Sequence, residues 1–369
     1  MDSAYVAIGT RLSRLLKLCL KNKCAVHPKY GLRFLLLWQS GIWSSVFHIV
    51  EKIKYKREIK KHAKPQRPVF IVGHWRTGST LLHQLMALDT HFATPSVFQV
   101  TVPDCYISIE RYYKPLMKKV MGKKRPMDNV KFGPDAPQED EFALLRLTQN
   151  SPLQYLLFPK SDQYFLNGMT ALLPEPDKIS YWKAQLSGFY KKLSFTSRRR
   201  ILIKNPFHSM RIEVLKEIFP DALFIHIYRN PFDVVPSTAR MWDIIGKQNC
   251  MNRKWQKPPI KEVADFMKIM LDTISLNFKD LDKNQYVEVA FEDLEKKPVE
   301  TVKHIYQHLN IPFSTSLEAR INEFCEAEKG YVKNTHKLSR ADVDIIQQSL
   351  HAYIAKHNYE VPQKNISEK

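Results

Sequence analysis

Hydrophobic and polar positions follow a repeating pattern from residue 68 onward. Short, mainly apolar runs are each followed by a segment with apolar residues at helical spacing. The runs cover residues 68–72, 200–204, 223–228 and 286–290, and the helical segments cover 79–88, 210–219, 233–245 and 299–309. Strands that are apolar throughout and alternate with helices are typical of a parallel sheet covered on both faces. The pattern predicts an α/β fold of three layers.

Residues 1–64 have a different pattern. Leu12, Leu15, Leu16 and Cys19 recur at helical spacing, residues 34–50 carry no charge, and residues 52–67 are rich in Lys and Arg. The uncharged stretch contains polar residues and is shorter than the roughly 20 apolar residues that span a bilayer. The segment could be a peripheral membrane contact. A helical layer packed on the rest of the protein is favoured, because amphipathic helices usually bury their apolar stripe in their own protein.

The domain prediction follows from these two patterns. We expect a helical, basic extension over residues 1–64 and one α/β domain over residues 65–369, with a mostly helical insertion between residues 90 and 195. The chain carries 57 Lys and Arg against 37 Asp and Glu, a formal net charge of +20. Such an excess predicts an anionic partner. Nucleic acid is not expected, because the basic tracts contain no aromatic or helical reading module.

The five cysteines are scattered, with no Cys-x-x-Cys pair. We therefore expect neither a disulfide framework nor a zinc site, and a reducing compartment. The first residues do not resemble a secretory signal. The expected location is the cytoplasm, with peripheral contact at the inner membrane face as an open alternative.

A glycine turn lies between the first predicted strand and its helix. The segment 73–80 reads Gly-His-Trp-Arg-Thr-Gly-Ser-Thr, where backbone N–H groups and the helix dipole would attract an anion. It has both glycines of the nucleotide-binding pattern G-x-x-x-x-G-K-[ST], but Ser79 occupies the lysine position and Arg76 supplies the cation. The turn predicts a P-loop-like three-layer sandwich with a central parallel sheet, a helical N-terminal extension and a helical insertion.

These differences from the nucleotide-binding pattern also indicate whether the site uses a metal. A P-loop kinase needs the lysine, a hydroxyl on Mg²⁺ and an Asp at the end of a later strand. Here no lysine follows Gly78, and the third predicted strand ends in Tyr228 and Arg229. A nucleotide site without a metal is expected. A P-loop nucleotide kinase remains the less favoured alternative.

Three blocks together are similar to the PAPS-dependent sulfotransferases, in their bacterial-type and tyrosyl-protein branch (PAPS is 3′-phosphoadenosine-5′-phosphosulfate). Residues 75–80 resemble the family's P-[KR]-[ST]-G-[ST]-[ST], with Trp75 in place of proline. Residues 229–237 resemble its R-[ND]-P-x-D-x-x-x-S, and residues 286–298 resemble its late Y/F-E-D-L…P block. The resemblance implies transfer of a sulfuryl group from PAPS to a hydroxyl, leaving 3′-phosphoadenosine-5′-phosphate (PAP).

The resemblance also implies donor-binding residues. The 5′-phosphosulfate would be bound by the turn, at Arg76, Thr77, Gly78, Ser79 and Thr80. The 3′-phosphate would be bound by two residues of the second block, Arg229 and Ser237. Independently of the family, an arginine at the carboxyl end of a parallel strand lies where open sheets bind ligands, and its guanidinium can bind phosphate through two hydrogen bonds. The residues that hold adenine are left open, because residues 329–334 have only weak similarity to the family's C-terminal loop.

The sequence offers fewer candidates for catalysis than for donor binding. Arg76 and Lys204 would stabilise the transferring group, and Lys204 begins a segment resembling the family's K-x-P-F. Glu139, in an acidic cluster that opens a predicted helix, or His208 would act as the base. His74 is a further alternative for the base, and His336 a weaker one.

The acceptor is the least specified part. The apolar, basic N-terminus and an aromatic-rich insertion favour a lipophilic alcohol such as a sterol or glycolipid; aromatic residues of the insertion include Phe98, Tyr106, Tyr112, Tyr113, Phe132, Tyr155 and Phe158. A carbohydrate or another small-molecule alcohol is the alternative. A protein that binds anions or membranes without catalysis is a third interpretation, although it would not need both phosphate blocks.

Overall fold

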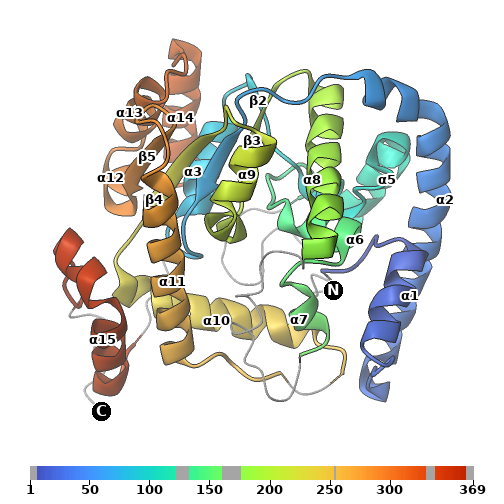
Figure 1. Ribbon diagram of the computed structural model, residues 1–369, viewed down its shortest axis with the longest axis horizontal. Coiled ribbons are helices and arrows are strands. Elements are labelled where there is room, and N and C mark those ends of the chain that lie inside the picture. The colour runs from blue at the N-terminus through green and yellow to red at the C-terminus, as the bar shows by residue number, and fades with distance from the viewer. Residues whose placement is uncertain (1–5, 122–132, 160–175, 253–254, 330–336, 363–369) are drawn as a thin grey trace. The chain divides into compact units, whose positions relative to one another are not determined.

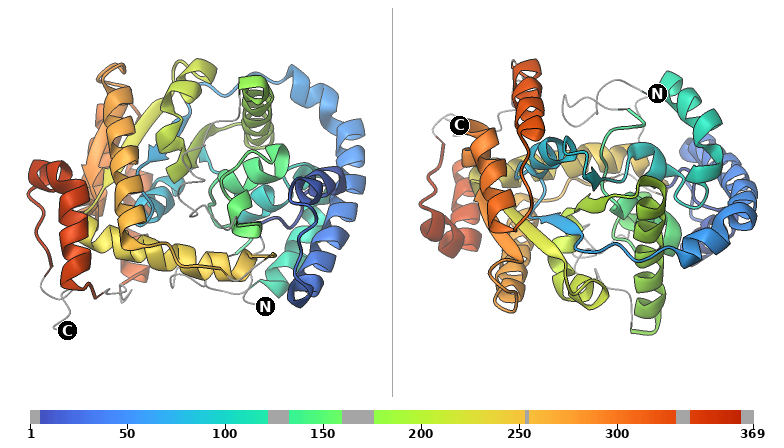
Figure 2. Two further views of the ribbon diagram at one scale, coloured as in Figure 1. Left: turned by 60° about the horizontal axis from the view of Figure 1, so that its bottom comes forward. Right: turned by 90° about the horizontal axis from the view of Figure 1, so that it is seen from above.

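The computed structural model describes residues 6–121, 133–159, 176–252, 255–329 and 337–362 (Figures 1 and 2). Within these residues the strands form a five-stranded sheet in the order β2-β3-β1-β4-β5. The strands are β1 (Val69–Val72), β2 (Phe92–Ala93), β3 (Arg200–Lys204), β4 (Leu223–Tyr228) and β5 (Tyr286–Ala290). Strand β1 pairs in parallel with β3 and β4, and β4 pairs in parallel with β5. The predicted α/β class and the four apolar strands are confirmed, whereas β2 is too short to give a pattern.

The helices also follow the predicted segments, with one difference. The segment predicted as a helix over 210–219 is shorter, because Met210 ends a 3₁₀ turn that begins at Pro206 and the helix itself covers Ile212–Ile218. The α-helices of the N-terminal half are α1 (Leu12–Lys21), α2 (Gly31–Lys61), α3 (Ser79–Ala87), α4 (Val97–Thr101), α5 (Tyr106–Val120), α6 (Glu141–Thr148), α7 (Gln154–Leu157) and α8 (Pro176–Ser197). Those that follow are α9 (Ile212–Ile218), α10 (Pro231–Asn249), α11 (Ile260–Phe278), α12 (Phe291–Lys296), α13 (Pro298–His308), α14 (Thr315–Ala327) and α15 (Arg340–His357). The 3₁₀ turns are η1 (Pro28–Tyr30) and η2 (Pro206–Met210).

The chain divides into two compact units. The first unit comprises Met1–Pro65, Ala93–Ile201 and Asp243–Gln256, and the second comprises Gln66–Phe92, Leu202–Trp242 and Lys257–Lys369. The N-terminal extension therefore belongs with the helical insertion in the first unit. Whether residues 1–64 and 65–369 form separate domains stays a prediction.

The sheet of the second unit has helices on both faces (Figure 1). Alternate residues point to opposite sides, so Val69 and Ile71 join a core made by α3, α13 and α14. On the other face the rings of Phe70 and Phe224 stack at 5.5 Å, and Phe224 also lies against Phe278 of α11. These two apolar faces produce the three layers that the strand–helix alternation predicts.

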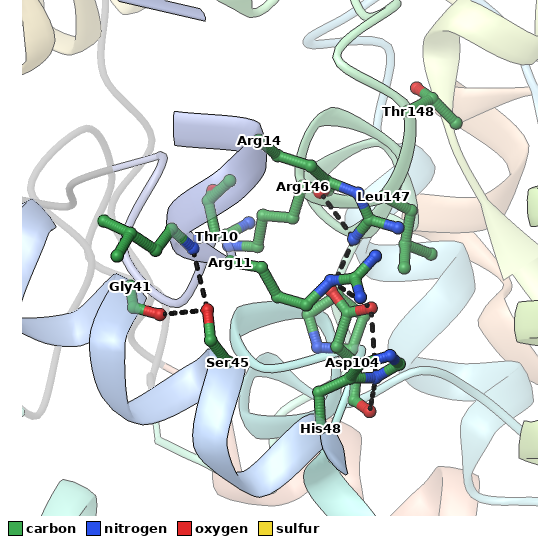
Figure 3. A network of polar contacts seen from close by, with 12 residues as sticks. Thr10, Arg11, Arg14, Gly41, Ser45, His48, Asp104, Arg146, Leu147 and Thr148 are labelled. Carbon is green, nitrogen blue, oxygen red and sulfur yellow. Dashed lines mark hydrogen bonds and ion pairs between the residues drawn. The ribbon is translucent and has the colours of Figure 1, made fainter. Parts of the chain in front are cut away.

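The N-terminal helices of the first unit are held by buried ionic contacts (Figure 3). The carboxylate of Asp104 lies 2.6 Å from Arg14 Nη1 and 3.1 Å from Arg11 Nε. His48 of α2 approaches the same residue, with Nδ1 3.3 Å from the backbone oxygen of Asp104. Arg14 also donates to the backbone oxygen of Arg146 at 3.2 Å. The inner faces of α1 and α2 are therefore built into the unit.

A second buried pair fixes α2 about one turn after His48. Glu51 forms an ion pair with Lys192 of α8, and Lys192 Nζ lies 4.1 Å above the ring of Tyr106. Lys192 also donates to the backbone oxygen of Pro103 at 2.8 Å. Removing one partner of a buried ion pair typically costs about 3–5 kcal/mol, because the other charge stays buried. The helical layer favoured by the sequence is thus present on the inner face of α2.

Candidate active site

The predicted phosphate turn joins β1 to α3 in a strained conformation. Gly73, Arg76 and Gly78 have φ angles of +136°, +67° and +92°. A Cβ atom at Gly73 would lie 2.4 Å from the backbone oxygen of Ile227, and one at Gly78 would lie 2.1 Å from the ring of Phe291. Both glycines are therefore required by sterics as well as by φ. Arg76 adopts the left-handed region with a full side chain, at a cost of about 1–2 kcal/mol, as residues at functional sites often do.

Hydrogen bonds from neighbouring elements hold the turn in place. The hydroxyl of Ser209, in η2, accepts from the backbone N–H of Gly73 at 2.8 Å. Thr77 donates to the backbone oxygen of His74 at 2.8 Å, and Thr238 of α10 donates to that of Trp75 at 3.3 Å. The backbone of the turn is therefore preorganised by side chains.

Trp75, which stands where the resembling family has proline, anchors the turn from the side. Its ring lies 4.9 Å from Phe207, 5.2 Å from Trp242 and 5.7 Å from Phe266, centroid to centroid. Trp75 is buried. Edge-to-face and stacked contacts of this kind stabilise a loop that proline would otherwise stiffen.

The N-terminus of α3 has backbone groups that are suited to an anion. Gly78 is the N-cap residue and gives no side-chain cap to the first turn, which begins at Ser79 and Thr80. The first N–H groups of an α-helix have no partner within the helix and carry the positive end of its dipole. Backbone groups in this arrangement suit a phosphate or sulfate ester.

Arg76 of this turn lies close to two residues of the second predicted phosphate block. Arg76 Nε donates to the hydroxyl of Ser237, in α10, at 3.0 Å. Arg229 follows β4, and its Nη1 lies 3.5 Å from the backbone oxygen of Arg76. The second unit therefore brings together three residues that the sequence predicts for the donor, although they lie up to 161 positions apart.

The guanidinium of Arg229 is itself held by its neighbours. Its Cζ lies 4.3 Å above the ring of Phe291, and Nη2 lies 3.4 Å from Asp233 of α10. The hydroxyl of Tyr353, in α15, donates to the backbone oxygen of Arg229 at 2.9 Å. Burial raises the pKa of the Tyr353 hydroxyl, which therefore stays protonated as a donor. These contacts fix the start of the phosphate block.

Lys204 and His208 lie next to the turn in the same unit. Lys204 is the last residue of β3, pairs in register with Ile71 of β1, and is buried. The carboxyl ends of both strands therefore meet at one edge of the sheet, where α/β proteins bind ligands. His208, in η2, is fully buried, and its ring lies 5.8 Å from that of Phe70.

His74 is buried within the turn. Burial lowers the pKa of His74 to about 4, so the imidazole is neutral at pH 7. Its Nδ1 lies 3.0 Å from the backbone oxygen of Trp75, which makes Nδ1 the protonated nitrogen. This hydrogen bond and the contact with the Trp75 ring at 5.2 Å give His74 a role in shaping the turn.

Glu139 belongs to the first unit, whereas the other catalytic candidates belong to the second. It is half-buried and stands two residues before α6, whose N-cap residue is Asp140. Asp140 accepts a hydrogen bond from the hydroxyl of Tyr190 at 2.5 Å. The role of Glu139 as a base stays a prediction. His336, also named as a candidate, lies outside the described residues, as do Phe132 and residues 330–334.

Comparison with known proteins decides the family. A profile of the Sulfotransferase family matches residues 68–315, which include all three predicted blocks. The chain belongs to the sulfotransferase family. The fold, the family and the enzyme class predicted from the sequence are confirmed. Sulfotransferases of this family take the sulfuryl group from PAPS, and the turn and its arginines have the chemistry to bind that donor.

Two curated relatives match almost the whole of this chain. The omega-hydroxy-beta-dihydromenaquinone-9 sulfotransferase Stf3 of Mycobacterium bovis is 28% identical over 365 residues, covering 97% of this chain and 92% of the relative. The same values hold for the protein of that name from Mycobacterium tuberculosis. The N-terminal helices are thus part of the similarity.

Solved structures share the fold. Sulfotransferase STF9 from Mycobacterium avium has a TM-score of 0.70 at 18% identity, covering 91% of this chain and 88% of that one. Sulfotransferase STF1 from Mycobacterium tuberculosis has a TM-score of 0.67 at 16% identity, covering 92% of both chains. The three-layer fold is therefore that of known sulfotransferases.

The sequence did not reveal every residue that supports this sulfotransferase's turn. Phe291 and Tyr353 contact Arg229, and Ser209 holds Gly73, but none was a candidate. Phe291 lies inside the third block, so the block itself was a signal for it. Tyr353 lies 124 positions from Arg229 with no local motif. No cluster of three or more His, Cys, Asp or Glu side chains suited to a metal occurs among the described residues.

Proposed function

We propose that this sulfotransferase acts on a hydroxyl group of a lipophilic alcohol, with Arg76, Lys204, Arg229 and Ser237 as its donor-side residues. The observation that carries the donor site is the convergence of Arg76, Ser237 and Arg229 at the N-terminus of α3. The acceptor class is supported by the similarity to Stf3, whose name specifies a hydroxylated menaquinone derivative.

The roles of the residues follow from their chemistry. The backbone N–H groups of Thr77, Gly78, Ser79 and Thr80 would hold the 5′-phosphosulfate, and Arg229 with Ser237 would bind the 3′-phosphate. When bound, PAPS supplies an activated sulfur. The cations of Arg76 and Lys204 stabilise charge that develops on the sulfuryl and bridging oxygens.

Proton transfer completes the reaction. The acceptor oxygen forms a bond to sulfur while the bond from sulfur to the 5′-phosphate oxygen breaks, and PAP leaves with that electron pair. The acceptor proton passes to a base, for which Glu139 is the first candidate and His208 the second. His74 is less suited, because its Nδ1 donates to the backbone oxygen of Trp75 and its ring thereby shapes the turn. The proposed transfer is in line and uses no metal.

A titration tests the donor site. Isothermal calorimetry with PAP, ADP and ATP, each with and without Mg²⁺, should give sub-millimolar binding for PAP and no dependence on the metal. Preference for ATP with Mg²⁺ would instead support the kinase alternative.

A second experiment tests the acceptor. Sulfation assays should compare detergent-dispersed alcohols, namely a hydroxylated isoprenoid quinol, a sterol and a glycolipid, with soluble sugars. Turnover of at least one lipid alcohol and none of the sugars is expected. Turnover of sugars alone would establish the carbohydrate alternative.

The described aromatic residues of the insertion divide between core and surface. Phe98 and Tyr106 are fully buried and Tyr112 is exposed. These residues therefore do not by themselves define an acceptor pocket.

No described helix meets the length and apolarity that crossing a bilayer requires. A cytoplasmic location with peripheral contact at the membrane remains part of the proposal.

A further inference from the structure

Helix α2 is buried on one face and carries exposed apolar residues on the opposite face. Its inner face contains Leu37, Gly41, Ser44 and Glu51, which are buried in the first unit. Its outer face is exposed, and from residue 32 to residue 53 it is almost wholly apolar. A helix that has already buried one stripe normally carries polar residues on the other.

The exposed residues form one continuous stripe. At 3.6 residues per turn their positions fall on one side of the helix, which also carries one exposed polar residue, Gln39, between Leu35 and Ile42. Ile53 is 80% exposed, Leu32 73%, and Trp43 57%. We call this the outer stripe of α2; it comprises Leu32, Leu35, Ile42, Trp43, Val46, Ile49 and Ile53. At 1.5 Å per residue it is about 30 Å long.

The character of this side changes after Ile53. The same side of α2 continues with Lys56, Arg57 and Lys60, all exposed, and Lys52 and Lys54 flank Ile53. The acidic residues nearby are Glu51, which is buried against Lys192, and Glu58. The outer stripe is therefore apolar along most of its length and strongly basic at one end.

We propose that the outer stripe of α2 docks on a lipid bilayer with anionic headgroups. This proposal rests on the proposed function, in which the acceptor is a lipophilic alcohol. A helix lying in the membrane interface inserts its apolar side chains into the acyl boundary and places basic residues on the headgroups. Tryptophan is favoured at that depth. The inner face, fixed by Asp104 and Glu51, holds the helix to the enzyme.

A second copy of the chain fits the stripe less well. If two stripes met in parallel, the basic ends with Lys56, Arg57 and Lys60 would face each other and repel. If they met antiparallel, each basic end would lie against apolar residues and lose its hydration. An anionic membrane satisfies both parts of the stripe at once.

Vesicle flotation of the full-length protein tests the proposal. The vesicles are phosphatidylcholine alone, or phosphatidylcholine with one third phosphatidylglycerol. We expect binding to the anionic vesicles and at least about tenfold weaker binding for the triple variant Ile42→Gln, Val46→Gln, Ile49→Gln. The matched control is Ile269→Gln with Leu276→Gln, two exposed apolar residues of α11, which should bind as the unchanged protein does.

A charge exchange tests the basic end. Lys56→Glu with Lys60→Glu should remove the preference for anionic vesicles, whereas Lys279→Glu with Lys303→Glu, which changes the net charge equally, should retain most of it. Absence of vesicle binding by the unchanged protein, or equal binding by the triple variant, overturns the proposal. So does a dimer in light scattering that the triple variant converts to a monomer.

Two further readouts separate this proposal from the proposed function. PAP titration of every variant should be unchanged, because the outer stripe belongs to the first unit and the turn at residues 73–80 to the second. Sulfation of a detergent-dispersed lipid alcohol should also persist in the triple variant, while sulfation of the same alcohol in vesicles falls. If the unchanged protein binds anionic vesicles but sulfates none of the lipid alcohols, the proposed acceptor is overturned and the docking surface stays in place.

Discussion

The Nε atom of Arg76 donates a hydrogen bond to the hydroxyl of Ser237 at 3.0 Å, across 161 positions of sequence. One residue belongs to the turn proposed to bind the 5′-phosphosulfate and the other to the block proposed to bind the 3′-phosphate. The two ends of the donor site are therefore linked through protein contacts. Arg229 adds to the link, because its guanidinium lies close to the backbone oxygen of Arg76.

Arg76 and Ser237 should contribute to different steps. Arg76→Ala should lower kcat by about 10²–10³-fold, because a cation over the transferring group is lost. Ser237→Ala should mainly weaken PAP binding, by about fivefold, which corresponds to one lost hydrogen bond. Steady-state kinetics with PAP titration measure both effects. If the double variant equals the sum of the single variants in free energy, the hydrogen bond between them has no energetic role.

Gly78→Ala should disrupt the turn. Its φ of +92° and the distance of only 2.1 Å that would separate an added Cβ from the Phe291 ring both oppose a side chain. We expect a loss of about 2 kcal/mol or more in the free energy of unfolding and loss of detectable PAP binding. Urea unfolding and calorimetry provide the measurements. Gly31→Ala is the control, since a Cβ there meets nothing within 4 Å; a similar defect in that variant would contradict the steric explanation.

Tyr353→Phe should weaken PAP binding although Tyr353 lies far from the phosphate turn in the sequence. The hydroxyl is the donor to the backbone oxygen of Arg229, and its loss should let that residue shift. About fivefold weaker PAP binding is expected, with kcat little changed. Tyr306→Phe is the matched control, because its hydroxyl donates to Asp89 at 3.0 Å within the core. That control should lose stability but bind PAP normally; unchanged affinity in Tyr353→Phe would rule out a positioning role.

His74 should make the protein less stable in mild acid. In the unfolded chain a histidine takes up a proton near pH 6.5, whereas burial lowers the pKa of His74 to about 4 in the folded protein. Its contribution to stability is therefore complete above pH 6.5 and is lost as the pH falls to about 4, a change of about 3 kcal/mol. Urea unfolding at several pH values should show a smaller loss in His74→Asn. The exposed-histidine control His351→Asn should follow the unchanged protein, and equal pH profiles for all three would contradict the prediction.

Local patterns predicted much of the fold. Strands β1, β3, β4 and β5 are short apolar runs between polar segments, so consecutive residues are enough to indicate that each strand is buried. The conformation of the turn at residues 73–80 was also predictable, because glycines at fixed spacing mark a backbone that other residues rarely adopt. Arg229 and Ser237 were found for a similar reason, since both lie in one short block at the end of a strand.

Contacts between distant segments were not predictable. The support that Tyr353 gives to Arg229 depends on where α15 packs, and no pattern near residue 353 specifies that position. Asp104 is a further example, because a single carboxylate in a helical insertion gives no sign that Arg11 and Arg14 will surround it. The approach of Glu139 to the acceptor is of the same kind and remains a prediction.

The sequence by itself determined the α/β class, the glycine turn at residues 73–80 and the sulfotransferase blocks, because each depends on residues that are neighbours along the chain. Only the tertiary structure decided which face of each helix is covered. The apolar residues of α2 at positions 32–53 are compatible with burial of the face that is exposed, but the contacts of His48 with Asp104 and of Glu51 with Lys192 selected the opposite face. Burial is a property of the assembled layers, so the exposed outer stripe could be recognised only once they were in place.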